Sequence, residues 1–81
     1  MPTILTKDGF KVRIYPNDHL PAHVHVFKAG GEAKINLLGE NGCPEFTSVS
    51  SGMSDRDAIK ALEIVEANQL ELLEKWKEYH G

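Results

Sequence analysis

The chain has 81 residues, of which 41% are hydrophobic, 26% charged and 7% aromatic. This length allows a single domain, residues 1–81, and the apolar share is too high for a disordered chain. Twelve acidic and nine basic residues give a net charge of -3, which excludes an overall attraction to nucleic acid or anionic membranes but allows a local basic patch.

Features of membrane and secreted proteins are missing from the sequence. No apolar run approaches the ~20 residues that cross a bilayer, and residues 1–9 lack the apolar core of a signal peptide. Cys43 is the only cysteine, so neither an internal disulfide nor a cysteine-based zinc site can form. These observations predict a cytoplasmic protein without a membrane partner.

Residues 1–53 have the pattern of a β-sheet. Turn-forming residues divide this part at the short spacings typical of hairpin-linked strands. Adjacent hairpins place consecutive strands side by side, which predicts a small antiparallel meander. The expected strands are Thr3–Thr6, Phe10–Tyr15, His23–Lys28, Glu32–Leu38 and Glu45–Val49.

Residues 54–81 are predicted to be helical. Ser54 can cap a helix, and acidic residues follow it in the first turn, where the helix dipole favours them. Apolar residues recur every three or four positions, so one helix face should pack on the sheet. This apolar stripe is interrupted at residues 67–69. The segment can therefore form either one helix of ~37 Å or two helices with a bend at Asn68. The predicted fold class is therefore α+β, with one long, kinked or paired C-terminal helix packed on one face of the sheet.

The far end of this helical part would extend beyond so small a sheet. Its apolar residues must fold back on the chain or meet another chain, so a homodimer or partner contact through the C-terminal helix and a simple fold-back are both open. These residues are Leu72, Leu73, Trp76 and Tyr79.

Side-chain alternation divides each strand into a core face and an open face. The apolar residues of the second, third and fourth strands leave a mostly basic set on the open face, with Glu32 as its acid. We expect Lys11, Lys34 and Tyr15 to form a binding surface there, with RNA as a partner.

Three of the four histidines lie within seven residues, at His19, His23 and His25. His23 and His25 are two apart on a strand and point to the same side, and Pro21 lets His19 fold back toward them. Such a cluster could bind a divalent metal, with Asp18 as a fourth ligand or as an orienting group.

Two other interpretations of the cluster stay open. In the first, His23 and His25 act as acid and base on a phosphodiester, and Arg13 stabilises the developing charge, which would make a metal-independent RNA-cleaving enzyme. In the second, the histidines are half-exposed residues that pack on neighbouring aromatic rings, and no cofactor is needed.

Three segments resemble a known family over nearly the whole chain. They are Met1-Pro2-Thr3-Ile4, Asn17-Asp18-His19-x-Pro21-x-His23-x-His25-Val26 and Leu72-Leu73-x-x-Trp76-x-x-x-His80. The sequence resembles the small bacterial proteins of domain of unknown function 4160, whose members often carry a second proline where this chain has Ala22. The resemblance implies a cytoplasmic module bound to a small protein partner in a toxin-antitoxin-like pair. RNA cleavage and metal binding are the alternative hypotheses.

Overall fold

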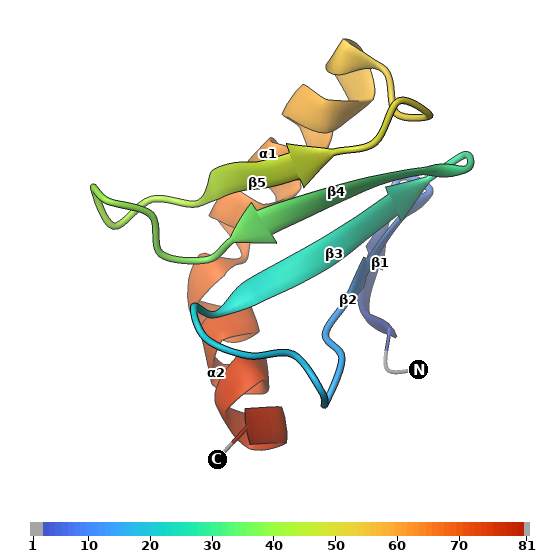
Figure 1. The fold of residues 1–81 in the computed structure, drawn as a ribbon. Helices are drawn as coiled ribbons and strands as arrows, with labels where there is room; N and C mark the ends of the chain where they lie inside the picture. The colour runs from blue at the N-terminus through green and yellow to red at the C-terminus, as the bar shows by residue number, and fades with distance from the viewer. Residues whose placement is uncertain (1–2, 81) are drawn as a thin grey trace.

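The computed structural model describes residues 3–80 and arranges them as a five-stranded sheet with two helices on one face (Figure 1). Met1 and Pro2 of the opening motif and Gly81 lie outside the described residues. This α+β arrangement confirms the predicted fold class. In chain order the elements are β1 (Thr3–Lys7), β2 (Phe10–Arg13), β3 (His23–Lys28), β4 (Gly31–Asn36), β5 (Glu45–Val49), α1 (Asp55–Ala67) and α2 (Gln69–His80).

The sheet is a meander in which each strand pairs antiparallel with the next, in the order β1-β2-β3-β4-β5. Two-residue turns connect β1 to β2 at Asp8–Gly9 and β3 to β4 at Ala29–Gly30. The φ angles of these four residues are all positive, at 53°, 83°, 49° and 86°. Positive φ at both positions is the pattern of type I′ turns, whose twist matches that of paired strands. Local turn geometry therefore sets these two hairpins.

Strands β3 and β5 have the predicted bounds, and the other three differ at their ends. β1 is one residue longer than predicted. β2 ends at Arg13 rather than Tyr15, where the chain turns away from the sheet before Pro16, which has no amide hydrogen to pair. β4 spans Gly31–Asn36 rather than Glu32–Leu38, and its first residue directly follows the turn that ends at Gly30.

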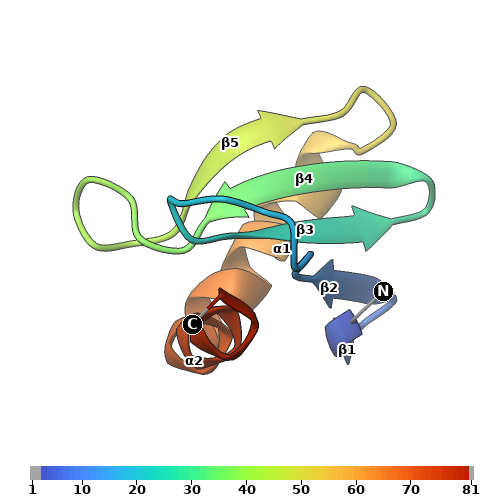
Figure 2. The same ribbon diagram turned by 60° about the horizontal axis from the view of Figure 1, so that its bottom comes forward.

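Both helices lie on the same side of the sheet, and Figure 2 shows α2 nearly end-on beneath it. Strand alternation sends one set of apolar side chains to this side, where they pack against the apolar stripe of the helices. The buried residues that form this core are Phe10, Val12, Ile14, Val24, Val26, Ala33, Ile35, Leu37, Met53, Ala58, Ala61, Ile64, Val65, Leu72 and Trp76.

The helical half begins at the predicted cap and breaks at the predicted residue. Ser54 Oγ accepts a hydrogen bond of 3.1 Å from the Asp57 amide, which satisfies one of the free donors of the first turn. Asn68 separates the two helices, and its side-chain amide donates to the Ile64 carbonyl at 2.8 Å. Of the two alternatives left open by the sequence, two helices is the correct one. Within the described residues, none of the helices is both long and apolar enough to cross a membrane.

The second helix continues roughly in the direction of the first instead of folding back (Figure 1). Gln69 secures the junction, because its Nε2 donates to the carbonyls of Leu37 at 2.7 Å and Gly42 at 2.8 Å. Leu72 is 1% exposed and Trp76 is 5% exposed, so the chain itself covers these two residues, whereas Tyr79 is 40% exposed. The homodimer stays an untested prediction.

Gly31 lets the start of β4 lie against the segment that leads into α1. A Cβ at this position would lie 2.5 Å from the Met53 amide nitrogen and 2.6 Å from its Cα. Backbone atoms cannot move aside at so short a distance without shifting the α1 connection. The close contact therefore requires glycine at this position.

We expect Gly31→Ala to lower the free energy of unfolding by about 1–3 kcal/mol, the usual cost of overpacking a buried site. Gly39→Ala is the matched control, because the atoms nearest to its Cβ belong to the side chain of Glu45, which can swing away. Urea unfolding of both variants measures the difference. Equal stability of the two variants would contradict the steric argument.

Candidate functional site

The site forms where the connection between β2 and β3, residues 14–22, lies over the end of the sheet. The Asp18 amide donates to the Tyr15 carbonyl at 3.0 Å, which makes a turn that brings Asp18 back toward β3. Pro21 and Ala22 then lead into β3, whose first residue is His23. Asp18 and the two strand histidines are thereby brought together.

The His23 ring is fixed by its own connection and is only 5% exposed. Its Nδ1 lies 2.9 Å from the Pro21 carbonyl oxygen. A carbonyl only accepts hydrogen bonds, so Nδ1 must carry the proton of this bond, and in the neutral ring Nε2 keeps a lone pair. This Nε2 lies 3.1 Å from Asp18 Oδ2, yet it is buried and makes no hydrogen bond within residues 3–80.

The His25 ring lies between two carboxylates. Its Nδ1 is 2.8 Å from Glu32 Oε2, and its Nε2 is 3.1 Å from Asp18 Oδ2. Glu32 reaches this ring from the neighbouring strand β4, where Lys34 is the residue directly opposite His25. Because the contact with Glu32 is the shorter one, we place the ring proton on Nδ1, which donates to Glu32. In the neutral ring, Nε2 of His25 then faces Asp18 with a lone pair, as Nε2 of His23 does.

One carboxylate oxygen is therefore approached by both histidines. Asp18, His23 and His25 each offer one ligand atom, and these atoms lie within 4.8 Å of one another. With neutral rings, three lone-pair acceptors face a common point, which is unfavourable unless a positive charge lies between them. Either protons on the two Nε2 atoms or a cation can supply that charge.

Aromatic rings hold the two imidazoles from both sides. Tyr15 meets His25 edge to face with ring centroids 4.7 Å apart, and the two histidine rings are 5.2 Å apart. On the other side Trp76 of α2 lies 5.2 Å from His23, and His80 stacks on Trp76 at 3.7 Å. The site is therefore built from the sheet, the connection and the second helix.

The predicted site residues fall into two groups. Asp18, His23 and His25 converge, whereas His19 is exposed and outside this group. His23 lies on the expected face of β3 but is not exposed there, because Trp76 and the β2–β3 connection bury it. Tyr15 packs on His25, as the packing interpretation expected.

The predicted catalytic and binding cations lie beside the cluster. The register places Arg13 opposite His25 and Lys11 opposite Phe27, and His25 is opposite Lys34 in the next strand. None of the three cations reaches a ligand atom of the cluster through any hydrogen bond or ion pair of residues 3–80.

Sequence reasoning missed three participants, namely Glu32 as a partner of His25, Trp76 beside His23, and His80 stacked on Trp76. The four-residue spacing of Trp76 and His80 was a usable signal, because residues four apart are neighbours on a helix surface. The contact between Trp76 and His23 had no local signal, because it depends on where α2 crosses the sheet.

The fold and the site together define a small α+β protein that carries an imidazole-carboxylate cluster at one end of its sheet. The family model for the domain of unknown function DUF4160 matches residues 9–77, and the chain belongs to this family. No curated protein and no solved structure matches the chain.

We expect both cluster histidines to keep a proton on Nδ1, whatever lies on the Asp18 side, because Nδ1 faces only the Pro21 carbonyl or the Glu32 carboxylate. Long-range ¹H-¹⁵N correlation spectra report this through the nitrogen shifts of each ring. His19, which lies outside the cluster, is the internal control. A ring of His23 or His25 protonated on Nε2 alone would contradict the assigned geometry.

Proposed function

We propose that this protein binds one divalent transition-metal ion through the Asp18 carboxylate and the Nε2 atoms of His23 and His25. The observation that carries the proposal is the convergence of these three ligand atoms on one point. Imidazole nitrogen together with carboxylate oxygen is a donor set that suits zinc, iron, nickel and copper.

The separations between the ligand atoms support this reading. Asp18 Oδ2 lies 3.1 Å from Nε2 of His23 and 3.1 Å from Nε2 of His25. Ligands at about 2.1 Å from an ion are roughly 3.0 Å apart in octahedral sites and roughly 3.4 Å apart in tetrahedral sites. Two of the three separations therefore match those around an ion, and the third, between the two histidine nitrogens, lies within 4.8 Å.

The outer partners of both rings support it as well. Histidines that bind metals usually donate their other N–H group to a backbone carbonyl or a carboxylate. His23 donates from Nδ1 to Pro21, and His25 from Nδ1 to Glu32, so each kind of partner occurs once. These bonds direct the Nε2 lone pairs toward Asp18.

Charge balance favours a divalent ion. With neutral rings, the carboxylates of Asp18 and Glu32 give the cluster two negative charges, and one divalent cation neutralises both. The ion also gives the buried Nε2 of His23 the partner that it lacks within residues 3–80. A buried polar atom without a partner costs about 1–3 kcal/mol, so filling this position stabilises the fold.

The cluster leaves room for chemistry at the ion. Three protein ligands leave at least one position of a four-coordinate ion for water or substrate. Asp18 and His23 also line a cavity of about 310 Å³ together with Lys34, Asn36 and Thr47. Direct acid-base catalysis by His23 is less well supported, because its Nε2 is buried and faces Asp18.

Metal binding is tested with untagged protein that has been treated with chelator. Titration with Co²⁺, followed by visible absorption, and with Zn²⁺, followed by calorimetry, should give one ion per chain. Asp18→Asn and His25→Gln should each weaken binding by at least about 100-fold, since loss of an outer partner alone costs ~10–100-fold.

His19→Gln is the matched control, because His19 lies in the same connection but outside the cluster. Its binding should equal that of the parent protein. Circular dichroism confirms that each variant is folded. Failure of the parent protein to bind either ion, or an equal loss in His19→Gln and His25→Gln, would refute the proposed centre.

A second candidate function is binding of a small protein partner, as in the toxin-antitoxin-like pair that the sequence resemblance implies. The observation that favours it is exposed apolar surface, because Leu20 is 80% and Leu38 54% exposed. Both residues line a cavity of about 600 Å³ between the β2–β3 connection and α2, with Leu73 at its side. Apolar surface of this kind is typical of protein interfaces.

Partner binding is tested by mixing the protein at micromolar concentration with the separately purified second protein of the pair that the resemblance implies. The two proteins should elute together, and Leu20→Glu with Leu38→Glu should separate them by placing charges in the apolar contact. Leu70→Glu is the control, since Leu70 is 77% exposed on α2 and outside this cavity. Separate elution of the unchanged proteins argues against this function.

A further inference from the structure

The open face of the sheet carries three cations beside the histidine cluster. Lys11 and Arg13 lie on β2, and Lys34 lies on β4. The strand register forms two cross-strand rows, one running from Lys11 through Phe27 and the other from Arg13 through His25 to Lys34. The three cations therefore lie on one continuous surface.

These cations have no acidic partner within residues 3–80. The ion pairs of this region join Lys60 to Asp8 and Lys75 to Glu78, and the remaining pairs belong to the histidines. Two acids of the cluster, Glu32 and Asp18, contact His25. With neutral rings, the three cations outnumber these two carboxylates by one, so the local charge is still positive.

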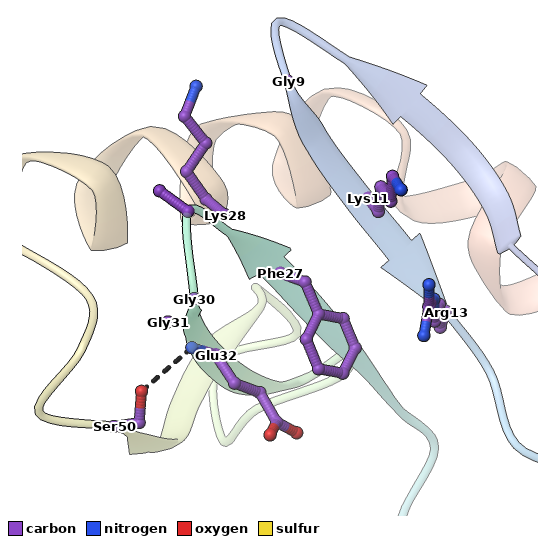
Figure 3. A pocket seen from close by; sticks show the side chains of 10 residues that line it. Gly9, Lys11, Arg13, Phe27, Lys28, Gly30, Gly31, Glu32 and Ser50 are labelled. Atoms are coloured by element: carbon purple, nitrogen blue, oxygen red, sulfur yellow. Dashed lines mark hydrogen bonds between the residues drawn. The ribbon is translucent and has the colours of Figure 1, made fainter.

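A hollow on this face combines two of these cations, Lys11 and Arg13, with an aromatic ring, whereas Lys34 lines a separate cavity beside the cluster. A cavity of about 430 Å³ is lined by Lys11, Arg13, Phe27, Glu32 and Ser50. Figure 3 shows the ring of Phe27 between Arg13 on one side and Glu32 on the other. This volume lies within the range of ~300–1,000 Å³ in which small ligands bind, so the hollow is large enough for a nucleobase.

The guanidinium group of Arg13 packs on an aromatic ring, and its Nε lacks a hydrogen-bond partner. Its guanidinium carbon lies 5.0 Å from the centre of the Phe27 ring, within the range of a cation-π contact. Its Nε is buried and makes no hydrogen bond within residues 3–80. Because the Nε is buried, a phosphate can reach this planar cation only at its terminal nitrogens.

We propose that this face binds a single-stranded polynucleotide, with phosphates at Lys11, Arg13 and Lys34 and a base against Phe27. Cations that follow the backbone and an aromatic side chain that stacks with a base are the usual elements of single-strand recognition. A duplex keeps its bases stacked inside and cannot offer one to Phe27. The inference does not depend on the metal proposal, because none of its contact residues is a proposed ligand.

The test measures fluorescence anisotropy of a labelled 12-nucleotide oligouridylate at several salt concentrations, with EDTA present to keep metal out of the result. Three phosphate contacts predict a slope of log K against log salt of about -2, at roughly 0.7 per contact for single strands. Lys11→Gln and Arg13→Gln should each reduce the slope by about 0.7. Phe27→Leu should weaken binding by roughly 5- to 100-fold.

Lys60→Gln and Arg56→Gln are the matched controls, because they remove the same charges from α1. Both should keep the slope and affinity of the parent protein. The exposed Lys11 keeps the test decisive if Arg13→Gln fails to fold. A slope near zero, or an equal effect of Lys11→Gln and Lys60→Gln, would overturn the proposal.

Binding of other polyanions tests whether the surface is specific for single-stranded polynucleotides. A 12-base-pair duplex should bind at least 10-fold more weakly, and polyglutamate should not compete at low micromolar concentration. Equal binding of either one would overturn the single-strand proposal in favour of a general anion surface. Oligodeoxyuridylate carries the same bases without the 2′-hydroxyl groups, so any difference from oligouridylate measures recognition of the 2′-hydroxyl group.

Discussion

The Asp18 carboxylate, which lies 3.1 Å from Nε2 of two histidines, is the contact on which the site depends. The connection between β2 and β3 is held by the buried Ile14 at its start and by the Ala22 carbonyl, which accepts from the Leu37 amide at 2.9 Å, at its end, and the contacts of Asp18 fix its middle. The outer bonds of the rings, to Pro21 and Glu32, leave Nε2 as the only nitrogen available to Asp18. Positive charge at this point therefore stabilises both the ring positions and the path of the connection.

A run of packed rings joins this contact to the helical half. The rings follow one another from the sheet to the end of α2, with neighbouring centroids 3.7–5.2 Å apart. Such pairs contribute about 0.5–1.5 kcal/mol each beyond the burial of their area. Trp76 thus has two roles, since it fills the core and also forms a wall of the cluster. The rings in order are Tyr15, His25, His23, Trp76 and His80.

Local rules were enough to predict most of the fold. Strand alternation, turn residues and the Ser54 cap are read from neighbours in the sequence, whereas the interrupted apolar stripe left open whether the helix breaks at Asn68. The ends of β2 and β4 were missed by one or two residues, because the turns that end them depend on backbone angles that the residue types only favour. The core face of the strands was predicted well, because strand alternation and the burial of apolar side chains select the same residues.

The site was only partly predictable for a different reason. His23 and His25 follow from the two-residue period of a strand, and Asp18 from its place in the preceding turn. The burial of His23 depends on Trp76, which is 53 positions away in the sequence. Trp76 reaches the ring only because α2 continues in the direction of α1 after the break at Asn68. The pairing of Glu32 with His25 depends on the register of β3 and β4. Contacts of this kind follow from tertiary packing, which no local pattern contains.

The arrangement of the two halves explains how a chain of net charge -3 can present a basic face. Residues 54–81 carry seven acids and four bases, and the helices that they form lie on the side of the sheet opposite the open face (Figure 2). The molecule measures 33 × 29 × 20 Å, whereas charges in physiological salt are screened beyond about 8 Å. An anion at Lys11, Arg13 and Lys34 therefore experiences these nearby cations much more strongly than the acids of the helices. The local arrangement of charge, and not its sum over the chain, decides what this surface can bind.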